Sequence, residues 1–325
     1  MEFKITPLES EADQHFFQEE EYRSYRENFS VPTDRPEEEV HQTFLADLEG
    51  YTRDLAHNQV YLAKNGSGEY AGMIWVARRT SKEPWDFSEM PGWIYDIRVR
   101  PKFRRSGLGR QLLAATESWA RDVDLPQIGL HVLGENAGAL SLYRASGFRA
   151  QYSYYQKDLT ADNLIEPDTD LIFRPYIDNQ DQEFTRRLLL RQYRIRAQAS
   201  ADPSEEQIEA GFEKCLRTYN FGNPEKQIII AGDRSGTSVG LLWFYQSKGD
   251  LGKRHYIWMH AAQAVEDHQM PDLLSYVEQW ALEHDLDAIR TPVHRVETRL
   301  TEILTNFDYH PANIFMYKYI DDTKI

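Results

Sequence analysis

Residues 98–110 read Arg-Val-Arg-Pro-Lys-Phe-Arg-Arg-Ser-Gly-Leu-Gly-Arg and contain six basic side chains and no acidic one. The segment 93–99 that leads into them is rich in aromatic and β-branched residues and is typical of a strand. Apolar residues at helical spacing follow: Leu108, Leu112, Ala115 and Trp119. Gly107 and Gly109 therefore fall where a strand ends and a helix begins. Backbone N–H groups and the positive end of a helix dipole can bind a pyrophosphate at such a place.

This glycine pattern differs from two common nucleotide loops. No Gly-Lys-Ser/Thr follows it, as a Walker loop requires, and Leu112 occupies the third glycine position of a dinucleotide fingerprint. Taken alone, the stretch fits a glycine turn with a solvated basic face as well as it fits an anion site.

A second motif, Asn136-x-x-Ala139-Leu140-x-Leu142-Tyr143-x-x-x-Gly147-Phe148, lies downstream. Together with Arg104-x-x-Gly107-x-Gly109 after a strand, it resembles the two signatures of the GNAT superfamily of N-acetyltransferases at their expected separation. The motifs cover about residues 93–148. The resemblance implies an α/β fold with a mixed sheet, and transfer of an acetyl group from acetyl-CoA to an amine.

The resemblance also implies roles for individual residues. Ile97, Arg98 and Val99 would pair with the pantetheine arm of CoA, and a backbone N–H there could stabilise the oxyanion of the thioester. Asn136 would contact the pantetheine. The backbone of the loop would hold the pyrophosphate through Arg104, Arg105, Ser106, Gly107, Leu108, Gly109 and Arg110.

Tyr143 matches the tyrosine that protonates the departing CoA thiolate in the family. The alternative is a buried helix tyrosine whose hydroxyl bonds a backbone carbonyl. The general base, which must deprotonate an ammonium, is predicted to be Asp96, with Glu135 and His131 as alternatives acting through water. Since side chains alternate along a strand, Tyr95 is the cleft residue if Asp96 faces away.

The chain also contains an internal repeat. A gapless offset of 161 pairs Tyr95 with Tyr256, Glu117 with Glu278, Trp119 with Trp280 and Lys157 with Lys318, and an offset of 168 pairs Asp13 with Asp181 and Trp75 with Trp243. We expect two tandem GNAT-like domains, residues 1–160 and 170–325. Each should be a twisted mixed sheet flanked by helices, and the polar segment 160–169 should join them.

The second copy departs from the motif. Adding 161 places His268 and Met270 at the glycine positions, Glu297 at that of Asn136 and Leu304 at that of Tyr143. The C-terminal domain is therefore expected to be degenerate and not to bind CoA in the family's way. Cys215 lies in a helical apolar pattern of this half, which favours a core position over a nucleophile.

Composition limits the partners. The 325 residues hold 37 Lys and Arg against 52 Asp and Glu, a net charge of −15, which disfavours nucleic acid and suits a cationic substrate. One cysteine fits a reducing cytosol, and neither a signal peptide nor a membrane span is expected. Ten histidines show no metal-ligand spacing. The acidic clusters 19–21 and 37–39 are expected to be solvated helix faces that could steer a cation.

These features predict a cytoplasmic N-acetyltransferase that transfers acetyl from acetyl-CoA to a small, cationic amine in a ternary complex, without a metal. The second domain would support the first, shape the acceptor cleft or form a homodimer. The alternative is a non-catalytic acyl-CoA sensor, and a transferase using charged tRNA fits the net charge poorly. The acceptor stays open among polyamine, aminoglycoside, amino acid and protein N-terminus.

Overall fold

The computed structural model describes residues 2–28, 36–53, 57–79, 86, 91–160, 162, 170–221, 223, 225–248 and 255–320. The chain forms two compact units, one of Met1–Lys82, Glu89–Ala150 and Phe315–Ile325, the other of Glu83–Ser88 and Gln151–Ile314. The predicted join lies almost entirely outside the described residues. Within the described part, no helix is long and apolar enough to cross a bilayer.

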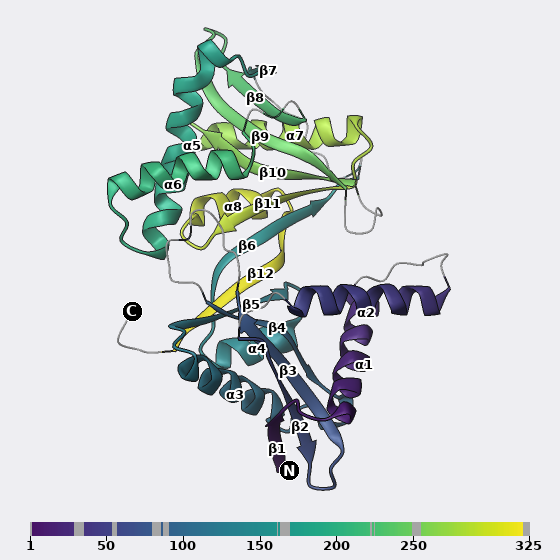
Figure 1. The fold of residues 1–325 in the computed structure, drawn as a ribbon. Coiled ribbons are helices and arrows are strands. Elements are labelled where there is room, and N and C mark those ends of the chain that lie inside the picture. Colours follow the sequence, from purple (N-terminus) through teal and green to yellow (C-terminus); the bar gives the residue numbers. More distant parts are fainter. Residues whose placement is uncertain are drawn as a thin grey trace. The chain divides into compact units, whose positions relative to one another are not determined.

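The first unit is a mixed sheet with helices on both faces (Figure 1). Its strand order is β1-β2-β3-β4-β5, and the C-terminal part of β12 follows β5; β12 as a whole spans His310–Tyr319. Among β1 to β5, neighbouring strands are antiparallel except β4 and β5, which are parallel. Its other elements are β1 (Phe3–Pro7), α1 (Glu11–Asn28), α2 (Glu37–Arg53), β2 (Gln59–Asn65), β3 (Tyr70–Arg78), β4 (Gly92–Val99), α3 (Leu108–Asp122), β5 (Gln127–Leu133) and α4 (Ala137–Ala145).

Two helices cover opposite faces of this sheet. Phe16 and Phe17 of α1 join one apolar cluster with Trp75 of β3. On the other face Trp119 of α3 lies so close to Gly92 that a Cβ there would come within 2.7 Å of its ring. Glycine at this position therefore lets the helix pack directly on β4.

The second unit repeats this plan. Its strand order is β6-β11-β10-β9-β8-β7, with α5 and α7 packed on the sheet. The elements are β6 (Arg149–Asp158), β7 (Ile172–Pro175), α5 (Asp178–Ser200), α6 (Glu205–Thr218), β8 (Lys226–Gly232), β9 (Ser238–Lys248), β10 (His255–Ala264), α7 (Met270–Glu283), β11 (Ala288–His294) and α8 (Thr298–Asn306).

The last strand of each copy belongs to the other copy's unit. β6, from the first copy, pairs antiparallel with β11 of the second. Lys157 of β6 binds Glu278 of α7 at 2.8 Å, and Lys318 of β12 binds Glu117 of α3 at 2.6 Å. In the repeat, Lys157 is equivalent to Lys318 and Glu117 to Glu278. In the structure, the lysine of each copy binds the glutamate of the other copy. Spatial units and sequence repeats differ at these strands.

A β-bulge marks the same place in both copies. In the first, β3 pairs Trp75 with Asp96 and Val76 with Ile94, so that Tyr95 is the extra residue of β4. A bulge places two consecutive side chains against one residue of the neighbouring strand and breaks the alternation of faces.

In the second copy, β9 pairs Trp243 with Ala261 and Phe244 with Met259, which leaves His260 as the extra residue of β10. Since Trp75 and Trp243 are equivalent, Tyr95 corresponds to His260. The gapless offset of 161 is therefore wrong for this strand, where the register gives 165.

The loop that follows is shorter in the second copy. Twelve residues separate Val99 from Leu112, whereas eight separate the equivalent Ala264 from Leu273. The second copy therefore lacks four residues of the loop, besides having lost its glycines. The offset of 161 holds again from this helix onward, because Leu125 and Leu286 close it with equivalent hydrogen bonds.

Candidate active site

The glycine loop of the first unit places the start of α3 at the surface. Gly107 has a left-handed φ of 86°, a conformation that costs a residue with a side chain about 1–2 kcal/mol. No side chain caps this helix, and Arg110 is the first residue whose N–H bonds back to Gly107. The N–H groups before it are therefore available to an anion.

Basic and small residues surround this helix start. The Arg104, Arg105 and Arg110 side chains are exposed, Ser106 donates Oγ to Phe103 O at 2.6 Å, and Arg104 Nε donates to Val99 O. A Cβ at Gly109 would come within 2.9 Å of Leu142, so this glycine allows α3 to pack against α4. The loop thus has the donors, the charge and the space that a pyrophosphate requires.

Strand β4 separates from β5 beyond their first residues. They pair only at Gly92–Ile128 and Trp93–Gly129, so the second half of β4 has an open edge. Ile97 N donates to Asp96 Oδ1 at 2.7 Å, so that candidate for the thioester contact is already bonded. Arg100 N donates to Ala71 O of β3, and by alternation the N–H of Val99 faces the open edge.

The second motif forms β5, a turn and α4. Asn136 is the N-cap of α4, where its Oδ1 accepts from Ala139 N at 3.0 Å, and Leu108 is buried beneath the loop. Tyr143 is buried on α4 with its ring 6.0 Å from that of Phe148. Burial and the nearby charge of Asp96 raise the pKa of Tyr143, which keeps its hydroxyl protonated.

The prediction that residues 19–21 form a solvated helix face is wrong for Glu20 and Glu21. Glu19 is exposed, but Glu20 and Glu21 are 2% and 8% exposed. Glu20 binds Arg23 at 2.9 Å and Arg100 at 3.0 Å. Residues 37–39, in contrast, are exposed as predicted.

Glu21 faces Asp96 of β4. Burial and the adjacent Asp96 carboxylate, with which it shares a hydrogen bond, raise the pKa of Glu21 well above its usual value. Asp96 is held by Ile97 N and by Arg98 Nε, the latter at 2.9 Å from Oδ2. Within the described structure Glu21 Oε1 is buried without a hydrogen-bond partner, an arrangement that is costly unless a ligand supplies one.

The bulge resolves the choice between Tyr95 and Asp96. The Tyr95 ring lies 5.0 Å from that of Trp75 and packs on the cluster that holds Phe16 and Phe17, while Asp96 meets Glu21 of the same helix. Both side chains therefore face α1, which simple alternation excludes.

The two alternative bases lie on β5 and in the turn after it. His131 contacts the rings of Trp93 and Phe315 and is exposed. Glu135 is exposed. Among the described residues, no three His, Cys, Asp or Glu side chains are grouped as metal ligands.

Sequence reasoning missed Glu21 although a signal was present. Asp13, Phe16, Phe17, Glu20 and Glu21 have the spacing i, i+3, i+4, i+7 and i+8, which defines the buried stripe of a helix. Acidic residues on such a stripe must be paired or functional.

Known proteins similar to this chain are acetyltransferases. The sequence model of the Acetyltransferase (GNAT) family matches residues 15–148. The aminoglycoside N(6')-acetyltransferase type 1 of Stenotrophomonas maltophilia is 36% identical over 121 residues, which are 35% of this chain and 69% of the relative. The chain belongs to the GNAT family.

Other GNAT proteins extend the comparison. The uncharacterized N-acetyltransferase YycN of Bacillus subtilis is 24% identical over 151 residues, 46% of this chain and 94% of the relative. The crystal structure of a GCN5-related N-acetyltransferase from Sphaerobacter thermophilus has a TM-score of 0.51 and 18% identity, and the match covers 98% of this chain and 96% of that one. This likeness shows the fold, two GNAT-like domains in one chain.

Proposed function

We propose that the N-terminal domain is an N-acetyltransferase that transfers acetyl from acetyl-CoA directly to a small cationic amine. The observation that carries this proposal is the pair formed by the buried Glu21 and the half-buried Asp96 near Tyr143, in the same unit as the uncapped basic start of α3. The C-terminal domain does not bind CoA in the family's way, since its loop lacks four residues and both glycines.

The loop and the open edge of β4 would hold the cosubstrate. The N–H groups of Gly107, Leu108 and Gly109 and the neighbouring arginines bind the pyrophosphate. The pantetheine arm lies along residues 97–99, where the N–H of Val99 can donate to it. Asn136 borders this path, with its Oδ1 engaged in capping α4.

Glu21 is the general base in this proposal, with Asp96 holding it in place. Two like charges cannot share a buried site easily, so Glu21 has an increased affinity for a proton and an unpaired oxygen to receive it. An ammonium group entering the site loses one proton to Glu21, which later releases it to solvent. The neutral amine then attacks the thioester carbonyl carbon.

Tyr143 completes the transfer. As the carbon–sulfur bond breaks, the hydroxyl of Tyr143 gives its proton to the thiolate. The second proton of the attacking nitrogen then restores Tyr143. The products are an acetamide, CoA as free thiol and one proton in solution, so charge and atoms balance. Holding the two reactants together supplies much of the rate enhancement.

The acceptor is proposed to be a polycationic small molecule such as an aminoglycoside or a polyamine. The Glu21–Asp96 pair favours a cation, and the relative from Stenotrophomonas maltophilia is named for action on aminoglycosides. No nucleic acid, membrane or metal takes part in this reaction.

Thiol release tests the proposal. The full chain should release free CoA thiol from acetyl-CoA with at least one of kanamycin, spermidine, lysine and a peptide N-terminus, and acetyl-CoA should raise its Tm. The Gly107→Val variant should lose both effects, because a side chain is strained at a φ of 86°. Binding without turnover on all four amines would instead support the acyl-CoA sensor.

A further inference from the structure

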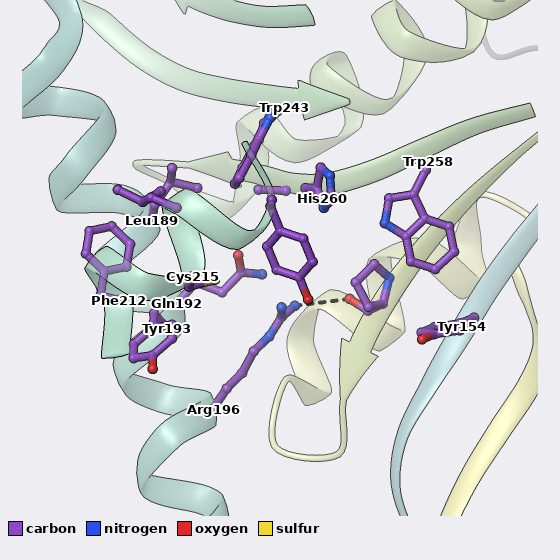
Figure 2. A pocket seen from close by; sticks show the side chains of 14 residues that line it. Tyr154, Leu189, Gln192, Tyr193, Arg196, Phe212, Cys215, Trp243, Trp258 and His260 are labelled. Carbon is purple, nitrogen blue, oxygen red and sulfur yellow. Dashed lines mark hydrogen bonds between the residues drawn. The ribbon is translucent and has the colours of Figure 1, made fainter. Parts of the chain in front are cut away.

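The second unit contains a pocket that is partly open to solvent (Figure 2). Side chains of α5, α6, β9, β10, β11 and β6 line it, and most of them are aromatic or aliphatic. All of these segments lie within the one compact unit, and none belongs to the acetyl-CoA loop of the first.

The strand registers of the two copies show which positions of the first copy correspond to this pocket. His260 and Ala261 line it, and they occupy the positions that Tyr95 and Asp96 hold in the first copy. By the offset of 168, Leu189 of the lining stands at the position of Glu21. The pocket thus occupies the place of the proposed catalytic centre, with both acids replaced by apolar residues.

Aromatic rings form its walls. The His260 ring lies 4.5 Å from that of Trp243 and 4.7 Å from that of Tyr219. On another side Tyr154 and Trp258 pack edge to face at 4.8 Å. Rings held by one another form a rigid surface that suits a flat ligand.

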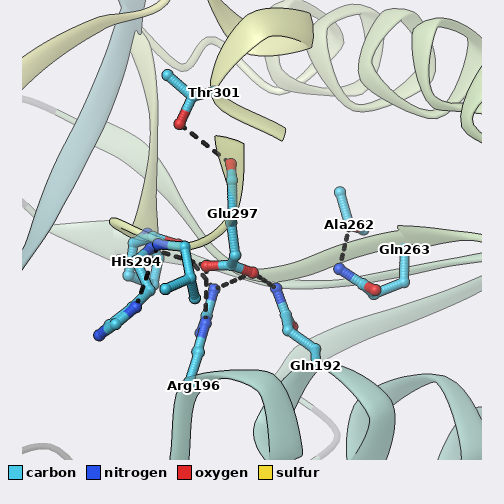
Figure 3. Close-up of polar contacts among 9 residues, drawn as sticks. Gln192, Arg196, Ala262, Gln263, His294, Glu297 and Thr301 are labelled. Atoms are coloured by element: carbon cyan, nitrogen blue, oxygen red, sulfur yellow. Dashed lines mark hydrogen bonds and ion pairs between the residues drawn. The ribbon is translucent and has the colours of Figure 1, made fainter. Parts of the chain in front are cut away.

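The charged lining residue is already neutralised. Arg196 of α5 donates Nε to Glu297 Oε2 at 2.9 Å and Nη2 to Pro292 O at 3.0 Å, and Gln192 donates to Glu297 Oε1 at 2.8 Å. The backbone N of His294 donates to the same carboxylate at 2.7 Å (Figure 3). The Arg196 and Glu297 side chains are 5% and 8% exposed, so this pair is removed from solvent.

His260 adds no charge either. Burial and the charge of Lys226 lower its pKa to about 3, so the imidazole is neutral near pH 7. A cation would find aromatic faces here, but the carboxylate near the pocket, Glu297, is bound by Arg196 and Gln192. An anion would find Arg196 already paired. The pocket is therefore best matched to an uncharged molecule.

We propose that this pocket of the C-terminal domain binds a small uncharged ligand with a planar ring, aromatic or heteroaromatic. The aromatic walls supply dispersion and stacking, and the fixed Gln192 supplies a polar contact; His260 Nε2 already lies 3.3 Å from Lys226 Nζ. This inference does not depend on the proposed acetyl transfer, since no residue of the first unit lines the pocket.

Three probes that share the indole ring system but differ in charge test the inference on the full chain: neutral indole, cationic tryptamine and anionic indole-3-acetate. Their dissociation constants would be measured by saturation-transfer NMR titration. Indole should bind saturably, and tryptamine and indole-3-acetate should each bind at least tenfold more weakly. Trp258→Ala should weaken indole at least tenfold. Tyr256→Ala, on the same strand outside the pocket lining, should leave its affinity within twofold.

Four results would overturn the inference: no saturable indole binding, tighter binding of either charged probe, indole affinity unchanged by Trp258→Ala, or an equal loss with Tyr256→Ala. The unfolding midpoint of each variant shows whether the second unit is intact. If Trp258→Ala unfolds, the ranking of the three probes on the unaltered chain still decides.

Discussion

The two copies of the fold keep their scaffold and differ at the positions of the proposed acetyl-CoA and acceptor site. In each, an aspartate of the first helix forms an ion pair with a basic residue of a neighbouring strand, Asp13 with Lys64 and Asp181 with Arg174. Each has a bulge at the same position of its fourth strand. What changed is the glycine loop and the acid pair. The comparison suggests a rule for this chain: residues shared by the copies maintain packing, whereas residues found in only one copy are candidates for function.

The largest expected effect concerns the acid pair that only the first copy has. Glu21→Gln should lower kcat by about 10²–10⁴-fold, because an amide cannot accept the proton. Glu19→Gln, an exposed neighbour on the same helix, should change kcat by less than twofold. Steady-state thiol release measures both. Equal kcat values for Glu21→Gln and the unaltered chain would contradict the assignment of Glu21 as the general base.

The same pair predicts a pH dependence. A base acts when deprotonated, and the pKa of Glu21 is raised above its usual value. The kcat/KM should therefore fall as pH decreases through this raised pKa, already at a pH where an ordinary glutamate is still ionised. A pH profile whose acid limb lies at the ordinary carboxyl pKa contradicts the assignment of Glu21.

The two ion pairs between the copies, Lys157–Glu278 and Lys318–Glu117, should contribute differently to stability because they differ in burial. Lys157 and Glu278 are 1% and 0% exposed, whereas Lys318 and Glu117 are 23% and 20% exposed. Lys157→Met should reduce the free energy of unfolding of the second unit by about 3–5 kcal/mol, since it leaves a buried carboxylate unpaired. Lys318→Met should reduce that of the first unit by about 1 kcal/mol or less. Urea unfolding of the full chain would contradict this if the two losses were equal.

Tyr143 has no counterpart in the second copy, where Leu304 replaces it. Tyr143→Phe should lower kcat roughly 10–100-fold, a smaller loss than that of the base because solvent can also protonate a thiolate. The affinity for acetyl-CoA should stay within threefold, as judged by calorimetry. Tyr61→Phe, on β2, is the matched control. A loss of affinity with no loss of kcat would assign Tyr143 a packing role.

The smallest effect concerns the histidines of the second copy. Burial lowers the pKa of His260 to about 3 and that of His294 to about 4. The unfolded chain then binds more protons, so the second unit should lose stability as pH falls below about 6.5. His260→Phe should lose less stability than the unaltered chain between pH 6.5 and 4, measured by urea unfolding. An identical pH dependence would show that His260 is solvated.

Local features of the first unit could be predicted from the sequence. The left-handed turn at Gly107, the cap at Asn136 and the buried Tyr143 follow from residue types at fixed spacing. Long-range features could not. The bulge at Tyr95 and the shortened loop are invisible to an offset that assumes no gaps, and which sheet the strands of Lys157 and Lys318 join depends on tertiary pairing.

The role of Glu21 depends on contacts that a sequence does not contain. Its place on a buried helix stripe could be predicted, but the partner Asp96 lies on a strand far along the chain. The pocket at His260 was missed for a related reason, because the wrong offset assigned Tyr256 to that position.

The number of acetyl-CoA molecules bound per chain tests the central claim most directly, that one copy keeps the ligand chemistry and the other has lost it. Calorimetric titration of the full chain should give one site, and Gly109→Val, which places a side chain against Leu142 at the start of α3, should abolish it. Two sites per chain, or one site that survives Gly109→Val, would contradict the account.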